Sequence, residues 1–169
     1  LERLRGVGPL DVAVVVPDAP GASRALEVAA RIDDVRVVAL EVQHALPEEL
    51  PRELGELEGV TTYVELPRGE RAEDVVRALG TSPYRGKIRT GGVESSAYPD
   101  EAELATLLVA LARTGVQFKA TAGLHHALRN TDPVTGFEQH GIVNLLVATH
   151  AAEQGAEADE VRALLAERD

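Results

Sequence analysis

Five runs rich in β-branched residues alternate with helix-like segments, and this alternation constrains the fold more than any other feature of the sequence. The runs cover residues 11–18, 35–43, 60–67, 86–92 and 116–123. The segments after them predict helices over 22–32, 47–59 (interrupted by Pro51), 71–80, 100–115, 137–155 and 157–169. The first four runs begin about 25 residues apart. Such alternation predicts an α/β fold with a parallel sheet covered by helices.

Polar residues recur at every second position near the C-terminal ends of the later four strands. They are Glu41, Gln43, Tyr63, Glu65, Lys87, Arg89, Gln117, Lys119 and Thr121. In a (β/α) barrel of the TIM type, one face of each strand meets the helices, and the other lines the axis and the C-terminal mouth. We therefore predict such a barrel, with an open flavodoxin-like sheet as the alternative. Because five strands cannot close an eight-stranded barrel, we expect only the C-terminal five or so βα units here.

The bulk properties narrow the class of protein. The 169 residues predict a single α/β domain over 1–169, and the opening 1–6, which is typical of a helix end, suggests that an upstream portion is missing. A net charge of -11 argues against nucleic acid and anionic membrane partners. No apolar run reaches the roughly 20 residues of a membrane span, so we expect a cytoplasmic location. A barrel would be completed by a homo-oligomer or by the N-terminal segment.

Three motifs carry a resemblance to a known family. "KIRTGG", "FKATAGLHH" and "HGIVN" lie between residues 84 and 150. Together they are similar to the motifs of an uncharacterised family of bacterial proteins. The resemblance implies a TIM-barrel-like α/β architecture and implies no activity, so the function must be argued from the residues.

Lysine is the scarcest cation in the chain. There are fifteen arginines and only Lys87 and Lys119, on strands predicted to be neighbours. Arginine is better suited to structural ion pairs, whereas a lysine crowded by another cation loses its proton and becomes a nucleophile or base. Lys119 and Lys87 are therefore candidate catalytic residues, with Glu41 and Glu65 to orient them or move protons. A buried ion-pair network is the structural alternative.

Glycines follow both lysine-bearing strands and suggest an anion site. Gly91, Gly92 and Gly123 leave backbone N–H groups accessible, as in the phosphate sites of many barrels. The candidate substrate-binding residues are Arg89, Thr90, Gly91, Gly92, Thr121, Gly123 and Asn144. A tight turn with no ligand is the alternative explanation for the glycines.

Three histidines are candidates for acid/base chemistry. His125 and His126 follow the fifth strand, and His140 is expected at the start of the next helix, one turn before Asn144. Adjacent histidines do not have a metal-ligand spacing, so proton transfer near neutral pH is the favoured role. Anchoring the loop 124–137 is the alternative.

A metal-dependent alternative rests on three carboxylates. Asp18, Glu41 and Glu65 end consecutive predicted strands, and Lys87 ends the next. This order is similar to that of the enolase superfamily, in which carboxylates hold Mg²⁺ and a lysine acts as base. The leading prediction has no metal and no cofactor, whereas this alternative requires Mg²⁺.

These residues favour an enzyme that acts on a small anionic metabolite, phosphorylated or carboxylated. The chemistry would be that of a lysine-dependent lyase, aldolase or isomerase at the mouth of the barrel. One alternative is the Mg²⁺-dependent lyase or racemase. The other is a non-catalytic half-barrel that binds a ligand or assembles with a partner chain.

Overall fold

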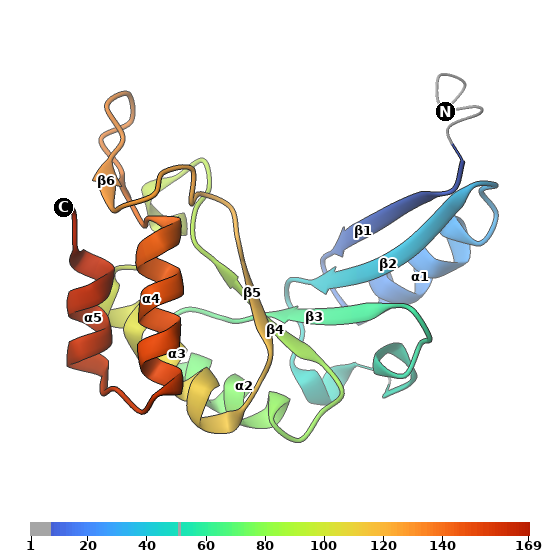
Figure 1. Ribbon diagram of the computed structural model, residues 1–169. Helices are drawn as coiled ribbons and strands as arrows, with labels where there is room; N and C mark the ends of the chain where they lie inside the picture. Colours follow the sequence, from blue (N-terminus) through green and yellow to red (C-terminus); the bar gives the residue numbers. More distant parts are fainter. Residues whose placement is uncertain (1–7, 51) are drawn as a thin grey trace. The chain divides into compact units, whose positions relative to one another are not determined.

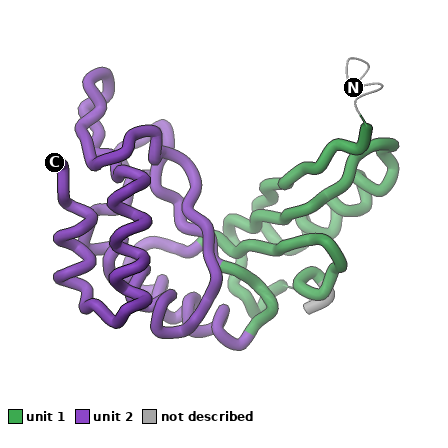
Figure 2. The backbone as a smooth tube through the Cα atoms, viewed as in Figure 1, with its two compact units in different colours: residues 1–65, 82–85 green, residues 66–81, 86–169 purple. Residues whose placement is uncertain are grey.

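A computed structural model describes residues 8–50 and 52–169 (Figure 1). The helix end expected at 1–6 and the interruption expected at Pro51 lie outside the described residues. The chain forms two compact units, drawn in two colours in Figure 2. Unit 1 comprises residues 1–65 and 82–85, and unit 2 comprises residues 66–81 and 86–169. The prediction of a single domain over the whole chain stays a prediction.

The fold is α/β, with a five-stranded sheet in the order β1-β2-β3-β4-β5 among the described residues. The strands are β1 Leu10–Val16, β2 Val35–Val42, β3 Thr61–Glu65, β4 Arg85–Arg89 and β5 Phe118–Thr121. β1 pairs with β2, β2 with β3, and β4 with β5, all in parallel. The predicted parallel α/β arrangement is confirmed, and closure as a TIM-type barrel stays a prediction.

Unit 1 contains β1, β2, β3 and the helix α1 Ala19–Ala29. α1 begins at Asp18, whose Oδ1 accepts a hydrogen bond of 2.8 Å from the N–H of Gly21. A side-chain cap of this kind satisfies one of the N–H groups that a helix leaves without an internal partner. Asp18 therefore has a structural role at the start of α1.

The prediction of a helix over 47–59 is wrong. Two short 3-10 turns, η2 Pro47–Glu49 and η3 Arg52–Gly55, occupy this segment. Leu50 has extended backbone angles (φ -87°, ψ 133°), which a following proline favours, and the helix cannot continue through it. Gly55 packs so closely on Pro83 that an added Cβ would lie 2.3 Å from its Cγ.

The helices of unit 2 are α2 Ala72–Leu79, α3 Glu101–Thr114, α4 Ile142–Glu153 and α5 Ala158–Ala166, with the turns η4 Gly69–Arg71 and η5 Ser95–Ala97. The longest helix, α3, packs on α4 and α5 (Figure 1). Its buried face includes Leu104, Leu108 and Leu111, and α5 buries Val161 and Leu165. No helix in the described part of the chain is both long and apolar enough to cross a membrane.

The helix expected over 137–155 begins later, at Ile142. The residues before it form a small antiparallel hairpin, with β6 Asn130–Thr131 paired to β7 Glu138–Gln139. Asp132 closes the hairpin turn, because its Oδ1 accepts hydrogen bonds from the N–H groups of Val134 and Thr135. His140 consequently lies between the hairpin and α4, and Gly141 is the N-cap of the helix.

Candidate functional site

The two lysines lie directly opposite each other on neighbouring strands of unit 2. The register of β4 and β5 pairs Lys87 with Lys119 and Arg89 with Thr121. Paired residues of a parallel ladder extend their side chains to the same face, so the two amines share one face of the sheet. Lys87 is only 3% exposed, whereas Lys119 is half-buried. Both lysines have interaction partners within the chain.

The ends of β4 and β5 are fastened together beyond the lysines. The N–H of Thr90 donates to the Thr121 carbonyl at 2.9 Å, and the Thr90 hydroxyl donates to the Ala122 carbonyl at 2.7 Å. A hydroxyl has only one proton to donate. Thr90 therefore acts here as a clamp between the strands. The Thr121 hydroxyl lies 3.5 Å from the Ile88 carbonyl, a weaker contact.

Gly91 and Gly123 approach each other too closely for a side chain on either. A Cβ on Gly91 would lie 2.8 Å from the Gly123 nitrogen, and a Cβ on Gly123 would lie 2.8 Å from the Thr90 oxygen. Tyr98 closes the same turn from the side, since its hydroxyl donates to the Gly92 carbonyl at 3.1 Å. Tyr98 was not among the residues predicted from the sequence, in which its only signal is an aromatic residue in the loop that follows two glycines.

Three consecutive residues after β5 have left-handed backbone angles. Ala122, Gly123 and Leu124 have φ values of 67°, 66° and 58°. This conformation costs about 1–2 kcal/mol at a residue other than glycine. Within residues 8–50 and 52–169, the N–H groups of Gly91, Gly92, Gly123 and Leu124 donate no hydrogen bond to the chain. These N–H groups lie in the turns after the lysine-bearing strands; Gly91 is buried, whereas Gly92, Gly123 and Leu124 are half-buried.

The two adjacent histidines are exposed in the loop after β5. His125 and His126 are solvent-accessible. The backbone of the same loop supports α4, because the carbonyls of His126 and Ala127 accept hydrogen bonds from the N–H groups of Ile142 and Val143 at 3.0 and 2.9 Å. The imidazole rings of His125 and His126 remain candidates for proton transfer at the mouth of the site.

His140 is buried and held at both ring nitrogens. It is 1% exposed, its Nε2 lies 2.8 Å from the Pro99 carbonyl oxygen, and its Nδ1 lies 3.3 Å from Nη1 of Arg129. A carbonyl can only accept and a guanidinium can only donate, so the ring is neutral with its proton on Nε2. Burial lowers the pKa of His140 below its ordinary value, and the Arg129 charge acts in the same direction. These contacts anchor the loop to the start of α3, and acid/base chemistry would require breaking them.

Asn144 also links distant segments. Its Oδ1 accepts from the N–H of Arg129 at 2.8 Å, and its Nδ2 donates to the carbonyls of Leu164 and Glu167 at 2.9 and 2.8 Å. The side chain is 3% exposed, and both amide hydrogens are in use. Asn144 thereby holds the 124–141 loop against the C-terminal end of α5. The Asn144 side chain therefore presents no exposed polar atom to a substrate, which its predicted role in substrate binding would require.

Arg129 is the centre of this anchoring network and was not among the residues predicted from the sequence. Its Nη2 lies 2.8 Å from Oε1 of Glu101 and 3.2 Å from Oε2 of Glu138, and its side chain is 7% exposed. Arg168 forms a further ion pair with Glu138. The sequence signal was limited to one arginine in a polar loop, because its partners are distant along the chain.

The candidate carboxylates Glu41 and Glu65 lie in unit 1. Glu41 is 8% exposed and pairs in the sheet register with Val15 and Tyr63. Among the residues that the structure describes, no three His, Cys, Asp or Glu side chains are grouped as a metal ion would need. The arrangement of Asp18, Glu41 and Glu65 thus gives the Mg²⁺ alternative no support.

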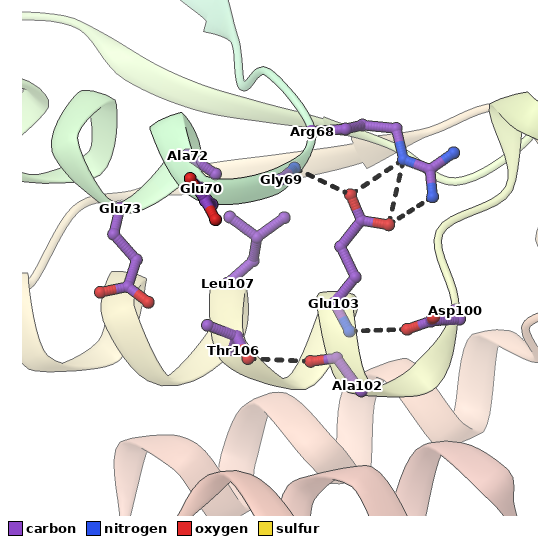
Figure 3. Close-up of a pocket in the computed structure, with 10 residues that line it drawn as sticks. All are labelled: Arg68, Gly69, Glu70, Ala72, Glu73, Asp100, Ala102, Glu103, Thr106 and Leu107. Carbon is purple, nitrogen blue, oxygen red and sulfur yellow. Dashed lines mark hydrogen bonds and ion pairs between the residues drawn. The ribbon is translucent and has the colours of Figure 1, made fainter.

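A separate pocket of about 730 Å³ lies between η4, the start of α2 and the start of α3 (Figure 3). Arg68 and Glu103 form an ion pair along one wall, and Leu107 contributes to its apolar lining. The pocket is lined by Arg68, Gly69, Glu70, Ala72, Glu73, Asp100, Ala102, Glu103, Thr106 and Leu107. Four carboxylates against one guanidinium disfavour an anion here. An anionic substrate is therefore not expected in this pocket.

Comparison with known proteins identifies no family. No family model matches the chain, and no curated protein matches it. One solved structure with some likeness is described as an NAD-binding protein from Listeria innocua, with 12% sequence identity and a TM-score of 0.29. The match covers 67% of this chain and 34% of that one, so the chain spans about a third of that protein's length. A likeness this weak carries no argument, and the family suggested by the motifs stays a prediction.

The lowered pKa of His140 predicts a pH-dependent stability. In the unfolded chain the imidazole regains its ordinary pKa of 6.5. At any pH between the lowered pKa of the folded chain and this ordinary pKa, the unfolded state therefore binds more protons. The contribution of His140 is complete above pH 6.5 and decreases as the pH falls below it. We expect His140→Gln, which can still donate to Pro99 and accept from Arg129, to flatten this slope in denaturant unfolding at different pH values. The exposed His150→Gln is the control, and equal slopes in His140→Gln and the unchanged chain would contradict the assignment.

The close approach of Gly91 and Gly123 predicts an unequal cost for two glycine substitutions. Gly115 has nearly the same φ as Gly123 (67° and 66°), but a Cβ at Gly115 meets nothing within 4 Å. Gly115→Ala should lose about 1–2 kcal/mol for its backbone conformation alone. Gly123→Ala should lose a further 1–3 kcal/mol, roughly, because the Thr90 carbonyl must move. Denaturant unfolding measures both, and equal losses would show that the turns are loosely packed.

Proposed function

We propose that the chain is an enzyme that acts on a small anionic metabolite, phosphorylated or carboxylated, through lysine-dependent lyase, aldolase or isomerase chemistry. The observation that carries the proposal is the register that sets Lys87 opposite Lys119, the only two lysines in the sequence. The proposed lysine would act as nucleophile or base toward the substrate.

Lys119 is the proposed reactive amine because it is half-buried and a substrate can reach it. Lys87, at 3% exposure, is the proposed neighbouring charge. In Schiff-base formation, Nζ of Lys119 bonds to the carbonyl carbon of the substrate, and the carbonyl oxygen leaves as water. The resulting iminium attracts electrons from the adjacent carbon, which permits carbon–carbon cleavage or proton removal.

The anionic group would bind at the turns that follow the two lysine-bearing strands. The N–H groups of Gly91, Gly92 and Gly123 are the proposed donors, with Arg89 as the nearby cation. Backbone N–H groups that converge beside cations are a common anion-binding arrangement. His125 and His126 would exchange protons with the substrate from the exposed loop after β5.

Borohydride trapping tests the proposed amine. We expect incubation with small phosphorylated or carboxylated aldehydes and ketones, followed by borohydride, to give a stable adduct that mass spectrometry locates at Lys119. The double variant Lys87→Arg/Lys119→Arg is the matched control, because its remaining amine is the N-terminus. Inorganic phosphate should reduce labelling by competing for the anion site.

The outcomes separate the proposal from its alternatives. Equal labelling of the unchanged chain and the double variant would contradict a reactive lysine. Phosphate binding without any adduct would favour the non-catalytic ligand-binding role. Labelling at Lys87 in place of Lys119 would reverse the two roles while keeping the reaction class.

A further inference from the structure

The three residues 91–93, just after β4, make a single hydrogen bond within residues 8–50 and 52–169. In that bond the Gly92 carbonyl accepts from the Tyr98 hydroxyl at 3.1 Å. The backbone N–H groups of Gly91, Gly92 and Val93 donate none to the described part of the chain. One side chain thus provides the hydrogen bond that orients the backbone of this turn.

The same contact determines where the N–H of Val93 points. The Gly92 carbonyl and the Val93 N–H belong to one peptide unit, and the described chain contains no cis peptide bond. In a trans peptide the carbonyl and the N–H point in opposite directions. Because the carbonyl faces Tyr98, the Val93 N–H faces away from it. A hydrogen bond at a carbonyl also polarises its peptide and strengthens the N–H as a donor.

The position of Val93 is open to a ligand. Valine in a folded chain is more often buried, whereas Val93 is 96% exposed. Its side chain therefore does little to hold the turn, and a small molecule can approach the backbone here. The N–H of Val93 follows directly on those of Gly91 and Gly92, which are proposed donors to the anion.

The ring of Tyr98 is itself held in place, which a positioning role requires. Its centroid lies 5.8 Å from that of Phe137 and the two planes are inclined by 59°, a tilted arrangement that aromatic pairs favour. The carbonyl oxygen of the next residue, Pro99, lies 2.8 Å from Nε2 of the buried His140. Two adjacent residues are thus fixed by the 137–140 segment, and the hydroxyl of Tyr98 holds the turn after β4 from there.

We propose that Tyr98 is a positioning residue for the anion site and that the N–H of Val93 is a further donor to the anion. The inference rests on the proposed function, in which the turns after β4 and β5 bind the phosphate or carboxylate group of the substrate. Donors that are already oriented bind more tightly than donors that must be ordered when the ligand arrives. Tyr98 contacts no substrate and acts through the Gly92 peptide.

Titration of the ¹⁵N-labelled chain with inorganic phosphate at constant ionic strength, followed through the Val93 amide resonance, tests the inference. In the unchanged chain this amide should shift with the same dissociation constant as the Gly92 amide. Tyr98→Phe removes only the hydroxyl and keeps the ring beside Phe137, so the fold should be retained. Loss of one hydrogen bond of this kind should raise the dissociation constant about threefold to tenfold.

Tyr84→Phe is the matched control. The Tyr84 hydroxyl also donates to a backbone carbonyl, that of Leu50, at 3.3 Å. Tyr84 comes just before β4, at the opposite end of the strand from the proposed anion site, so this variant should bind phosphate as the unchanged chain does. Denaturant unfolding of both variants measures their stability. A purely structural Tyr98 would lower the stability without changing the dissociation constant.

Each failure has a distinct signature. No saturable shift at any turn amide of the unchanged chain would contradict the anion site itself, and this inference with it. Saturable binding with an unshifted Val93 amide, or with equal dissociation constants in Tyr98→Phe and the unchanged chain, would overturn the inference and leave the anion site in place. An equal loss of affinity in Tyr84→Phe would also overturn it, because the effect would then be one of general stability.

Discussion

The close approach of the backbones at Gly91 and Gly123 is the constraint on which the candidate site depends. Neither residue has room for a Cβ, and the hydroxyl of Thr90 fastens the same two turns together. This contact determines how β4 and β5 end. The register in which these two strands pair places Lys87 opposite Lys119. The same turns carry the N–H groups that donate no hydrogen bond within the described residues. Glycine is therefore required at these positions for steric reasons, whether or not a ligand binds.

A second set of contacts keeps the surrounding loop in place. Arg129, His140 and Asn144 are all buried, and they connect the 124–141 segment to the start of α3 and to the end of α5. A rigid outer layer of this kind holds residues near a site without contacting the substrate. The exposed histidines at 125 and 126 begin this segment, so their positions depend on the same anchors.

Much of the fold could be predicted from the sequence because its signals are local. The β-branched runs and the spacing of helices predicted the parallel strands, and the regular repeat predicted that Lys87 and Lys119 would lie on neighbouring strands. The helix over 47–59 was wrong because the extended backbone at Leu50, which precedes a proline, and the tight packing of Gly55 on Pro83 leave only two short 3-10 turns there. The helix start at Ile142 was missed because the preceding residues pair in a hairpin.

The roles of His140 and Asn144 could not be predicted from sequence, since they depend on long-range partners. Pro99 and Leu164 lie 41 and 20 residues away from the side chains that bind them. A polar residue beside an apolar helix is consistent either with a role in catalysis or binding or with a role in anchoring a loop. Only the contacts of its side chain distinguish these two roles. Arg129 was missed for the same reason.

The central claim is that the turns after β4 and β5 bind an anion beside the lysines. Titration of the ¹⁵N-labelled chain with inorganic phosphate, followed through its backbone amide resonances, tests this claim most directly. The account predicts saturable shifts of the amides of Gly91, Gly92, Gly123 and Leu124 with one shared dissociation constant. Gly69, in the acidic pocket, should not shift. No change at the four turn amides, or larger shifts at Gly69 than at those turns, would contradict it.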